Sequence, residues 1–325
     1  MKALLCTAYG APEKLKLTEV DDLTPDAGEV IIEVHAAGLN YPDTLIIRGL
    51  YQFQPDLPFS PGGEVAGIVK SVGAGVSTVR VGDRVMAGTS WGGFAEEARA
   101  MASNTFVIPD EMSFEIAAAS CMTYGTSYHA LVDRASIKSQ ETILVLGASG
   151  GVGTAAIQIA KVLGARVIAA ASTDDKLDYC RSVGADDVIN YSKESIKART
   201  KELTWDRGVD VVFDPVGGQL AEPAFRAIAK GGRYLVVGFA GGAIPAIPWN
   251  LPLLKSAAIV GVFWGGFFRS EPEANRKNFE VLVDWFVAGK LSSKLHKTCS
   301  LEEIPEAMNE LLSRQVKGKM VALVR

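Results

Sequence analysis

The chain has 325 residues, of which 48% are hydrophobic and 22% charged, and its formal net charge at pH 7 is −4. That length accommodates two domains with separate cores, and the composition is typical of a soluble globular protein. No block of basic residues is present, which argues against a nucleic-acid partner, and the longest weakly polar run, residues 143–160, is broken by four glycines, which argues against a membrane span.

Residues 1–120 are expected to form mainly β-structure. Strand-like runs at 30–36, 67–72 and 84–87 are separated by turns rich in glycine, proline and aspartate. Short strands at regular spacing are typical of a barrel-like β domain. The apolar run at residues 1–6 is too short for a signal peptide.

From residue 121 the pattern changes to alternating strands and helices. Six strands are predicted, at 142–147, 166–171, 187–191, 209–214, 233–238 and 258–263. This alternation predicts a doubly wound parallel sheet with right-handed crossovers, the architecture of a dinucleotide-binding domain.

Near residue 265 the pattern changes again. Helices are predicted at 273–288 and 304–313, and a closing strand at 321–324. This tail is too small for a third domain, so we expect it to return to the first. The predicted domains are therefore a discontinuous one of residues 1–120 and 265–325, and a nucleotide-binding one of residues 121–264.

The strongest local signal is a glycine-rich turn between the first predicted strand of the second domain and the helix that follows. It reads Ala148-Ser149-Gly150-Gly151-Val152-Gly153, which is not a strict G-x-G-x-x-G. Free N–H groups and the helix dipole favour an anion at such a turn. Gly150 would let the backbone approach a pyrophosphate, and Gly153 would let the helix pack close to the strand. The alternative is an ordinary βα turn that binds nothing.

The end of the second strand of this domain indicates which nucleotide binds. An NAD site usually has Asp or Glu there, to bind the ribose 2′-hydroxyl. Here the position holds Ser172, and Lys176 follows four residues later. A hydroxyl and a cation suit a 2′-phosphate, so we predict NADPH rather than NADH. Asp174 and Asp175 are explained by the dipole of the following helix.

Cysteine and histidine usage gives no metal site. Cys6, Cys121, Cys180 and Cys299 are widely spaced, and three scattered histidines complete the set. No pair has the spacing of metal ligands, and no disulfide framework is indicated. We therefore expect no metal and a reducing, cytoplasmic compartment.

Seven short motifs occur in a fixed order along the whole chain. They are residues 38–44, 61–67, 81–85, 92–96, the glycine-rich turn, 214–218 and 318–319. Together they resemble the medium-chain dehydrogenase/reductase superfamily, specifically its zinc-independent, zeta-crystallin-like NADPH:quinone oxidoreductase family. The resemblance implies an α/β protein with a GroES-like β-barrel catalytic domain and a Rossmann domain, a doubly wound parallel six-stranded sheet.

The same resemblance bears on the metal. Zinc alcohol dehydrogenases of the superfamily have ligands of the catalytic zinc where this chain has Asn40 and Gly63, and a third ligand near Met122. Residues 91–104 of this chain also lack the cysteines that bind the structural zinc in those enzymes. The resemblance therefore implies a zinc-independent enzyme. Without a Lewis acid to stabilise an alkoxide, it implies hydride transfer from NADPH to a quinone or an α,β-unsaturated carbonyl.

Residue roles follow from the resemblance. Asn40 and Tyr51 are the candidate catalytic residues, since Tyr51 matches the proton donor of related enoyl thioester reductases and a phenol is a suitable acid. Helix capping is the alternative for Asn40, and a wall of the pocket for Tyr51. Leu45 replaces a second tyrosine of many quinone oxidoreductases and makes the acceptor pocket less polar. The implied cofactor contacts are Asn40, Thr126, Ser149, Gly150, Gly151, Val152, Gly153, Ser172, Lys176, Tyr191, Phe239, Phe263, Trp264 and Arg314.

These contacts divide by the part of NADPH that they would meet. Ser172, Lys176 and Tyr191 are assigned to the 2′-phosphate. Thr126, in the loop entering the nucleotide domain, is assigned to the nicotinamide, as are Phe239 and the pair Phe263–Trp264, for which core packing is the alternative. Arg314 is assigned to the cofactor side.

Three functions remain open at this point. The first is a quinone or enone reductase. The second is an enoyl thioester (enoyl-CoA) reductase, whose basic groove would draw on Arg48, Arg269, Arg276 and Lys277. The third is a non-catalytic NADPH- or RNA-binding protein. A homodimer is expected, paired through the last strand of the nucleotide domain at 257–263.

Overall fold

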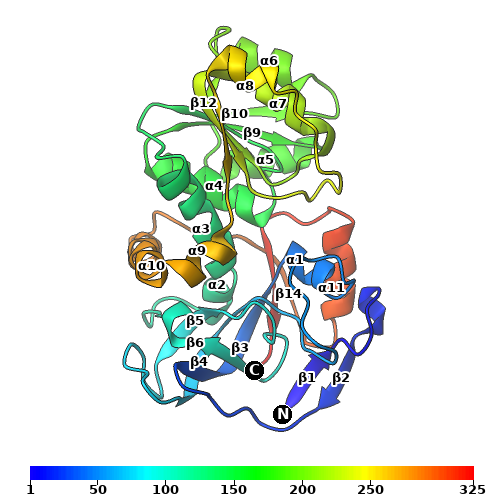
Figure 1. The fold of residues 1–325 in the computed structure, drawn as a ribbon, viewed down its shortest axis with the longest axis vertical. Helices are drawn as coiled ribbons and strands as arrows, with labels where there is room; N and C mark the ends of the chain where they lie inside the picture. The colour runs from blue at the N-terminus through cyan, green and yellow to red at the C-terminus, as the bar shows by residue number, and fades with distance from the viewer. The chain divides into compact units, whose positions relative to one another are not determined.

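The computed structural model describes all 325 residues, which divide into two compact units (Figure 1). The first unit comprises Met1–Met122 and Gly265–Arg325, and the second comprises Thr123–Trp264. The boundary predicted after residue 120 lies two residues before the boundary between these units. No helix of the structure is both long and apolar enough to cross a membrane.

The first unit is built on a seven-stranded sheet in the order β14-β15-β3-β4-β5-β7, with β6 also paired to β3. The strands are β3 (Glu29–Leu39), β4 (Glu64–Val72), β5 (Arg84–Gly88), β6 (Glu97–Met101), β7 (Thr105–Val107), β14 (Leu295–Cys299) and β15 (Lys319–Leu323). A separate antiparallel pair joins β1 (Lys2–Leu5) and β2 (Lys16–Glu19). Strand β15 pairs with β3 in the register Met320 to Leu39, so the C-terminal segment belongs to this unit.

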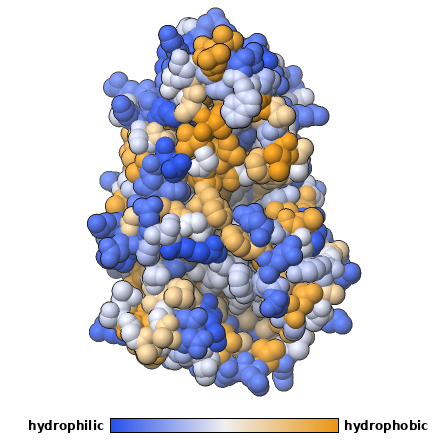
Figure 2. All heavy atoms as spheres, in the orientation of Figure 1, coloured by the Kyte–Doolittle hydropathy of each residue, from blue (hydrophilic) through white to orange (hydrophobic).

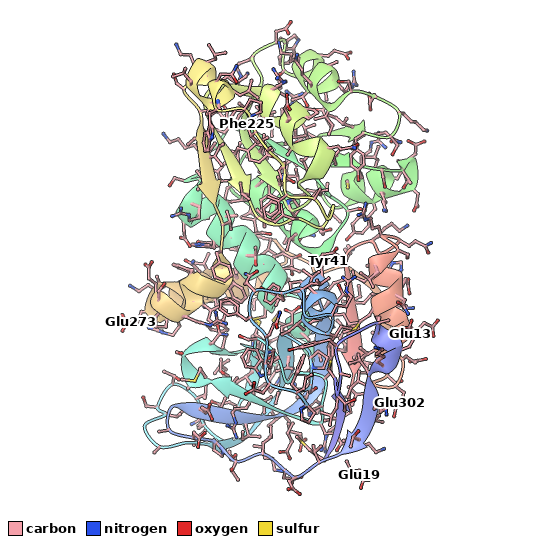
Figure 3. All side chains as sticks on the ribbon, turned by 45° about the vertical axis from the view of Figure 1, so that its right-hand side comes forward. Glu13, Glu19, Tyr41, Phe225, Glu273 and Glu302 are labelled. Atoms are coloured by element: carbon pink, nitrogen blue, oxygen red, sulfur yellow. The ribbon has the colours of Figure 1, made fainter.

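Helices also occur in the first unit, where the N-terminal part was predicted to be mainly β. They are α1 (Tyr41–Ile46), α2 (Phe114–Ala118), α10 (Pro272–Val287), α11 (Ile304–Leu312) and the 3₁₀ turns η1 (Pro12–Lys14) and η2 (Ala102–Asn104). The short helix α1 was missed because its six residues are too few to show a helical period. In α10 the exposed Glu273 projects outward (Figure 3), while Phe279 stacks on Phe106 with ring centroids 4.0 Å apart.

The second unit contains a six-stranded parallel sheet in the order β10-β9-β8-β11-β12-β13. Its strands are β8 (Thr142–Val145), β9 (Arg166–Ala171), β10 (Asp187–Asn190), β11 (Val209–Asp214), β12 (Ile228–Val236) and β13 (Ala258–Gly261). The order reverses between β8 and β11, which is the switch point where doubly wound sheets bind ligands. The predicted α/β fold with a GroES-like domain and a parallel sheet is confirmed.

Helices cover both faces of this sheet. They are α4 (Gly151–Val162), α5 (Asp174–Ser182), α6 (Ile196–Leu203), η4 (Gly218–Leu220), α7 (Ala221–Arg226) and α8 (Asn250–Lys255). Helices α6, α7 and α8 share one hydrophobic core with the strands, which includes the fully buried Phe225 (Figure 3). Helix α4 packs on β8 and β9, and α5 on β9 and β10. Helix α3 (Cys121–Tyr128) crosses the unit boundary and continues as the π-helix η3 (His129–Arg134); α9 (Trp264–Ser270) crosses the other boundary.

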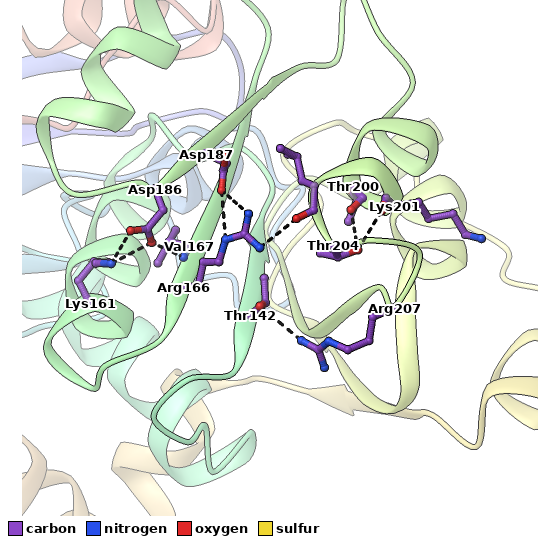
Figure 4. A network of polar contacts seen from close by, with 11 residues as sticks. Thr142, Lys161, Arg166, Val167, Asp186, Asp187, Thr200, Lys201, Thr204 and Arg207 are labelled. Atoms are coloured by element: carbon purple, nitrogen blue, oxygen red, sulfur yellow. Dashed lines mark hydrogen bonds and ion pairs between the residues drawn. The ribbon is translucent and has the colours of Figure 1, made fainter.

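Ion pairs at the amino ends of the strands hold β9 and β10 in register (Figure 4). Lys161 pairs with Asp186 at 2.7 Å, and Arg166 pairs with Asp187 at 2.7 Å. Asp186 also accepts a hydrogen bond from the backbone N–H of Val167 at 2.7 Å. These charges lie at the end of the sheet opposite to the carboxyl ends of the strands, so they stabilise the scaffold without occupying the switch point.

Candidate functional site

The glycine-rich turn follows β8 and leads directly into α4. A Cβ atom on Gly153 would lie 2.5 Å from the Gly147 carbonyl oxygen and 2.7 Å from the Ala148 Cα atom, so no larger residue fits. Gly150 is different, because a Cβ atom there would meet nothing nearer than 3.4 Å and its φ of −78° is accessible to any residue. The fold therefore requires Gly153, whereas Gly150 leaves space beside the first turn of α4, whose N–H groups lack intrahelical partners.

Three predicted residues meet at the carboxyl ends of β9 and β10. Lys176 Nζ donates to Ser172 Oγ at 3.4 Å. The backbone N–H of Tyr191 donates to the Ala171 carbonyl at 3.2 Å, which brings Tyr191 beside Ser172. A hydroxyl and a cation thus lie in contact at this edge of the sheet, beside the backbone of Tyr191, whose side chain packs against the hydrophobic core. Such a donor set fits a phosphate monoester.

Asp174 is engaged with the loop after β10. Its carboxylate accepts from Asn190 Nδ2 at 2.6 Å and pairs with Lys193 Nζ at 2.5 Å. These hydrogen bonds hold the pKa of Asp174 below its usual range, and the bond from Lys193 has the larger effect. The charge of Asp174 is therefore balanced by its neighbours. From the sequence alone, this residue is explained only by the dipole of the helix that it begins.

A pocket of about 570 Å³ lies along the outer edge of β10, lined by Asp174, Leu177, Arg181, Asp186, Asp187, Val188, Asn190, Lys193, Glu194 and Arg199. Its charged side chains are paired with one another or with neighbours, as Arg199 is with Glu194 at 3.8 Å. It does not include Ser172, Lys176 or Tyr191. We therefore treat it as a groove between ion pairs.

The aromatic residues assigned to the nicotinamide differ in exposure. Phe239 is 38% exposed and Phe263 45% exposed, whereas Trp264 is 5% exposed. The Phe239 ring lies against Gly217, where a Cβ atom would approach Phe239 Cδ1 to 2.8 Å. Core packing was the alternative role for these residues. The low exposure of Trp264 agrees with that role, whereas the exposure of Phe239 and Phe263 does not. Thr126, predicted to lie in a loop, is instead a partly buried residue of helix α3.

Asn40 is the N-cap residue of α1, and its amide is committed to internal hydrogen bonds. Its Nδ2 donates to Glu64 Oε1 at 2.7 Å and to the Gly38 carbonyl at 3.3 Å, while its Oδ1 accepts from Lys319 Nζ at 2.7 Å. The α1 cap itself is completed by Asp43, whose carboxylate accepts from the Asn40 backbone N–H at 2.7 Å. A substrate contact from Asn40, as predicted, would have to share or displace these bonds.

A buried charged cluster surrounds Asn40, and sequence reasoning missed it. Lys319 Nζ pairs with Glu64 Oε1 at 2.7 Å, and their side chains are 5% and 0% exposed. Glu64 Oε2 also accepts from the Met122 backbone N–H at 2.7 Å. Burial raises the pKa of the nearby Asp43 to about 7, an effect opposed by the Asn40 N–H and by Lys319. The available signal was the presence of one ionisable residue, Asp43, Glu64 or Lys319, in each of three of the short motifs.

Tyr51 lies close to this cluster in the first unit. It is partly buried against the hydrophobic core, and its ring stands edge-on to Phe53 with centroids 6.3 Å apart. Burial and the negative charge of Asp43 raise its pKa, while Arg269 acts in the opposite direction. The phenol is therefore protonated at neutral pH, as a proton donor must be.

The positions that hold zinc in related alcohol dehydrogenases have other contacts here. A side chain at Gly63 would begin 2.8 Å from Met122 Cε. No three His, Cys, Asp or Glu side chains gather as a metal site, and all four cysteines are free and buried. Arg314, assigned to the cofactor, lies exposed in the turn after α11, in a left-handed conformation with φ of 60°.

Comparison with known proteins agrees with this architecture. Residues 26–110 match the family model of the alcohol dehydrogenase GroES-like domain, and residues 151–286 match that of the zinc-binding dehydrogenases. Quinone oxidoreductase-like protein 2 of Bos taurus is 37% identical over 321 residues, covering 98% of this chain and 91% of the relative. The chain belongs to the quinone oxidoreductase family of the medium-chain dehydrogenases/reductases.

Solved structures of this family superimpose over nearly the whole chain. A mycobacterial protein complexed with NADPH has a TM-score of 0.94 at 30% identity, covering 99% of this chain and 100% of its own. Escherichia coli quinone oxidoreductase complexed with NADPH has a TM-score of 0.92 at 30% identity, with the same coverage. As a member of the quinone oxidoreductase family, the chain is an oxidoreductase.

Proposed function

We propose that this oxidoreductase transfers hydride from NADPH to a quinone or an α,β-unsaturated carbonyl without zinc. The observation that carries the proposal is the contact between Lys176 and Ser172 at the carboxyl edge of the sheet, beside the backbone of Tyr191. No acidic residue is free there to bind a ribose 2′-hydroxyl, since Asp174 is paired with Lys193. The family relatives solved with NADPH support the same cofactor.

The residues proposed to bind the nucleotide phosphates belong to the second unit, and the proposed proton donor belongs to the first. The first turn of α4 and Gly150 would hold the diphosphate, and Ser172, Lys176 and Tyr191 the 2′-phosphate. When bound, NADPH supplies the hydride, which gives the acceptor two electrons and one hydrogen, and one further proton completes the reduction. Tyr51 would donate that proton to the oxygen that becomes negative, and would recover one from solvent. Thr126, Ser149, Phe239, Phe263, Trp264 and Arg314 remain proposed cofactor contacts.

A second candidate, reduction of an enoyl thioester, is favoured by one observation. Three of the four basic residues expected to bind a carrier, Arg48, Arg269 and Lys277, have no carboxylate partner, whereas Arg276 pairs with Glu280 at 2.5 Å. A non-catalytic NADPH- or RNA-binding role has no comparable support.

We also propose a homodimer in a reducing, cytoplasmic compartment. Strand β13 ends the sheet, pairs only with β12 and exposes Ile259. Leu253 and Leu254 of α8 are 77% and 73% exposed, and Figure 2 shows hydrophobic side chains over this part of the second unit. An exposed strand edge beside apolar side chains suits pairing with a second copy.

Turnover of NADPH with a small panel of acceptors tests the proposed activity. The panel contains 1,4-benzoquinone, 9,10-phenanthrenequinone, a simple enone and crotonyl-CoA, each repeated with NADH. Faster turnover of the quinones or the enone, with NADPH preferred, supports the proposal. Turnover restricted to crotonyl-CoA supports the second candidate. No turnover in the presence of bound NADPH contradicts both.

A further inference from the structure

Arg269 is held in a fixed position on the surface of the first unit. It lies in α9, and its guanidinium carbon is 4.9 Å from the centroid of the Phe53 ring and 5.2 Å from that of Phe268. Its Nη2 donates to Ser90 Oγ at 3.1 Å. Contact with two aromatic rings and a hydroxyl orients the planar guanidinium before any ligand arrives.

The charge of Arg269 has no counter-charge. No carboxylate lies within ion-pair distance of it, although Arg276 on the neighbouring α10 pairs with Glu280 at 2.5 Å and Arg84 pairs with Asp110 at 3.6 Å. The residue is exposed, and a guanidinium carries five N–H donors, of which Ser90 takes one. Arg269 can therefore accept an anionic group in the geometry that carboxylates, sulfonates and phosphates prefer.

The residue that holds Arg269 is itself strained. Ser90 has φ of 67°, a left-handed conformation that is sparsely populated by residues other than glycine. The loop is fixed on either side by hydrogen bonds from the Thr89 N–H to the Gly63 carbonyl at 3.0 Å and from the Gly92 N–H to the Ser60 carbonyl at 2.7 Å. Such strain concentrates at ligand sites, where the surrounding structure maintains it.

Phe53 connects this cation to the proposed proton donor. Its ring contacts Arg269 and also stands edge-on to the ring of Tyr51, with centroids 6.3 Å apart. The electrostatic effect of Arg269 on the Tyr51 phenol agrees with this proximity. An acceptor protonated by Tyr51 would therefore present its nearby substituents to the Arg269 guanidinium.

We propose that Arg269 anchors the acceptor through an anionic group on it, a specificity that rests on the proposed reductase function. Two sources share this chemistry: an acidic substituent on the acceptor itself, and the phosphates of a thioester carrier. In either case Arg269 contributes to binding and leaves the chemical step unchanged.

Matched acceptor pairs distinguish the two sources in steady-state kinetics with NADPH. The first pair is 1,4-naphthoquinone and its 2-sulfonate; the second is crotonyl-CoA and the crotonyl thioester of N-acetylcysteamine, which has no phosphate. For Arg269→Gln, KM for the anionic member of at least one pair should rise by at least about tenfold, with KM for the neutral member and kcat changed by less than about twofold. Arg269→Lys should recover part of the loss. Arg80→Gln, an exposed arginine whose charge is already paired with Asp83 at 3.2 Å, is the matched control and should change neither.

Binding measured without turnover separates this inference from the proposed function. In calorimetric titrations with the sulfonate and with crotonyl-CoA, at least one of the two should bind the wild-type protein and bind Arg269→Gln about tenfold more weakly. If no acceptor is reduced, the proposed function fails while this titration still tests Arg269. Equal binding by wild type and variant, or equal changes in KM for charged and neutral acceptors, overturns the inference.

Discussion

At the scale of single residues, we predict that the choice of nucleotide depends on one cation. Lys176 is partly buried and lies 3.4 Å from the Ser172 hydroxyl, on the edge of the sheet that Tyr191 also reaches. A 2′-phosphate bound beside Ser172 would lie next to this ammonium, whereas Lys193 faces Asp174, with which it is paired. Reversing the charge of Lys176 should therefore act on NADPH and leave NADH largely unaffected.

For Lys176→Glu, we expect kcat/KM for NADPH to fall by at least about tenfold, or about 1.4 kcal/mol, with kcat/KM for NADH unchanged or slightly raised. Steady-state kinetics with both nucleotides and a single acceptor measure the ratio. Lys197→Glu, the same charge reversal on an exposed position of α6, is the control. An unchanged ratio in Lys176→Glu removes this residue from the nucleotide site.

Tyr51 is the residue whose role depends on the acceptor. Its raised pKa keeps the phenol protonated, so it can donate to an enolate oxygen that is a strong base. A quinone reduced at an exposed site can take its proton from water instead. Tyr51→Phe should therefore lower kcat with an enone by about a hundredfold and kcat with a quinone by less than about tenfold. Equal losses with the two acceptors, or none, would mean that Tyr51 is not the proton donor.

Asp43 couples stability to pH. Burial raises its pKa to about 7 from an ordinary value of 3.8, so the folded protein binds a proton that the unfolded chain releases between these values. The protonated Asp43 carboxyl therefore contributes most to the free energy of unfolding below the pKa of the unfolded chain, and this contribution is lost as the pH rises towards 7. The total loss is about 4 kcal/mol, at about 1.4 kcal/mol per pKa unit.

Urea unfolding of the wild type and of Asp43→Asn at pH 5 and pH 8 tests this prediction. The asparagine cannot titrate, so the difference in unfolding free energy between the two proteins should shift in favour of the variant at pH 8. Other carboxylates contribute equally to the pH dependence of both proteins, so their effect cancels in this difference. One of them is Glu141, whose pKa is lowered mainly by Arg233 and whose stabilising effect is lost at acid pH. The same difference at both pH values would show that Asp43 is ionised throughout this range.

At the scale of the element, the turn between β8 and α4 separates a requirement of folding from a requirement of binding. A methyl group on Gly153 would overlap the Gly147 carbonyl and Ala148, whereas one on Gly150 would meet no atom closer than 3.4 Å. Both glycines belong to one motif in the sequence, and only the packing around them distinguishes their functions.

We expect Gly153→Ala to destabilise the protein by about 1–3 kcal/mol, as overpacking in a core does. Gly150→Ala should cost less than about 1 kcal/mol, the loss of a tolerated N-cap residue. Thermal unfolding measures both. Titration of NADPH should show the opposite order, with Gly150→Ala weakening binding at least about tenfold because the methyl group fills the space beside the helix start. Unchanged affinity in Gly150→Ala would place the diphosphate elsewhere.

At the scale of the whole molecule, we predict that copies of the chain associate through the free edge of β13. Sedimentation analysis should give twice the mass of one chain for the wild type. Ile259→Lys places a charge on the exposed edge strand and should give the mass of a single chain. Trp205→Ser removes an aromatic residue that is 86% exposed but lies far from β13 in the chain, and should leave the dimer intact. A wild-type monomer, or a dimeric Ile259→Lys, would contradict the proposed interface.

Much of the fold follows from patterns that are local in the chain. Strands β9 and β11 have the predicted bounds, because short runs of mainly β-branched and apolar residues, each preceded by a glycine, specify buried parallel strands. Strand β12 begins five residues before its predicted start, at Ile228, because Gly231 and Gly232 interrupt the pattern while the backbone continues the ladder. The nucleotide loop and the Ser172–Lys176 pair were also predictable, since all their parts lie within one βαβ unit.

Only the tertiary structure decided which buried groups meet across long separations in the chain. Lys319, Glu64 and Asn40 come from three segments and form one hydrogen-bonded cluster, and Arg269 reaches Phe53 and Ser90 from a different part of the chain again. The sequence determined the residue types, the local elements and the family. It did not determine which charges are neutralised by partners and which remain available to a ligand, because desolvation and pairing depend on distances that no local pattern contains.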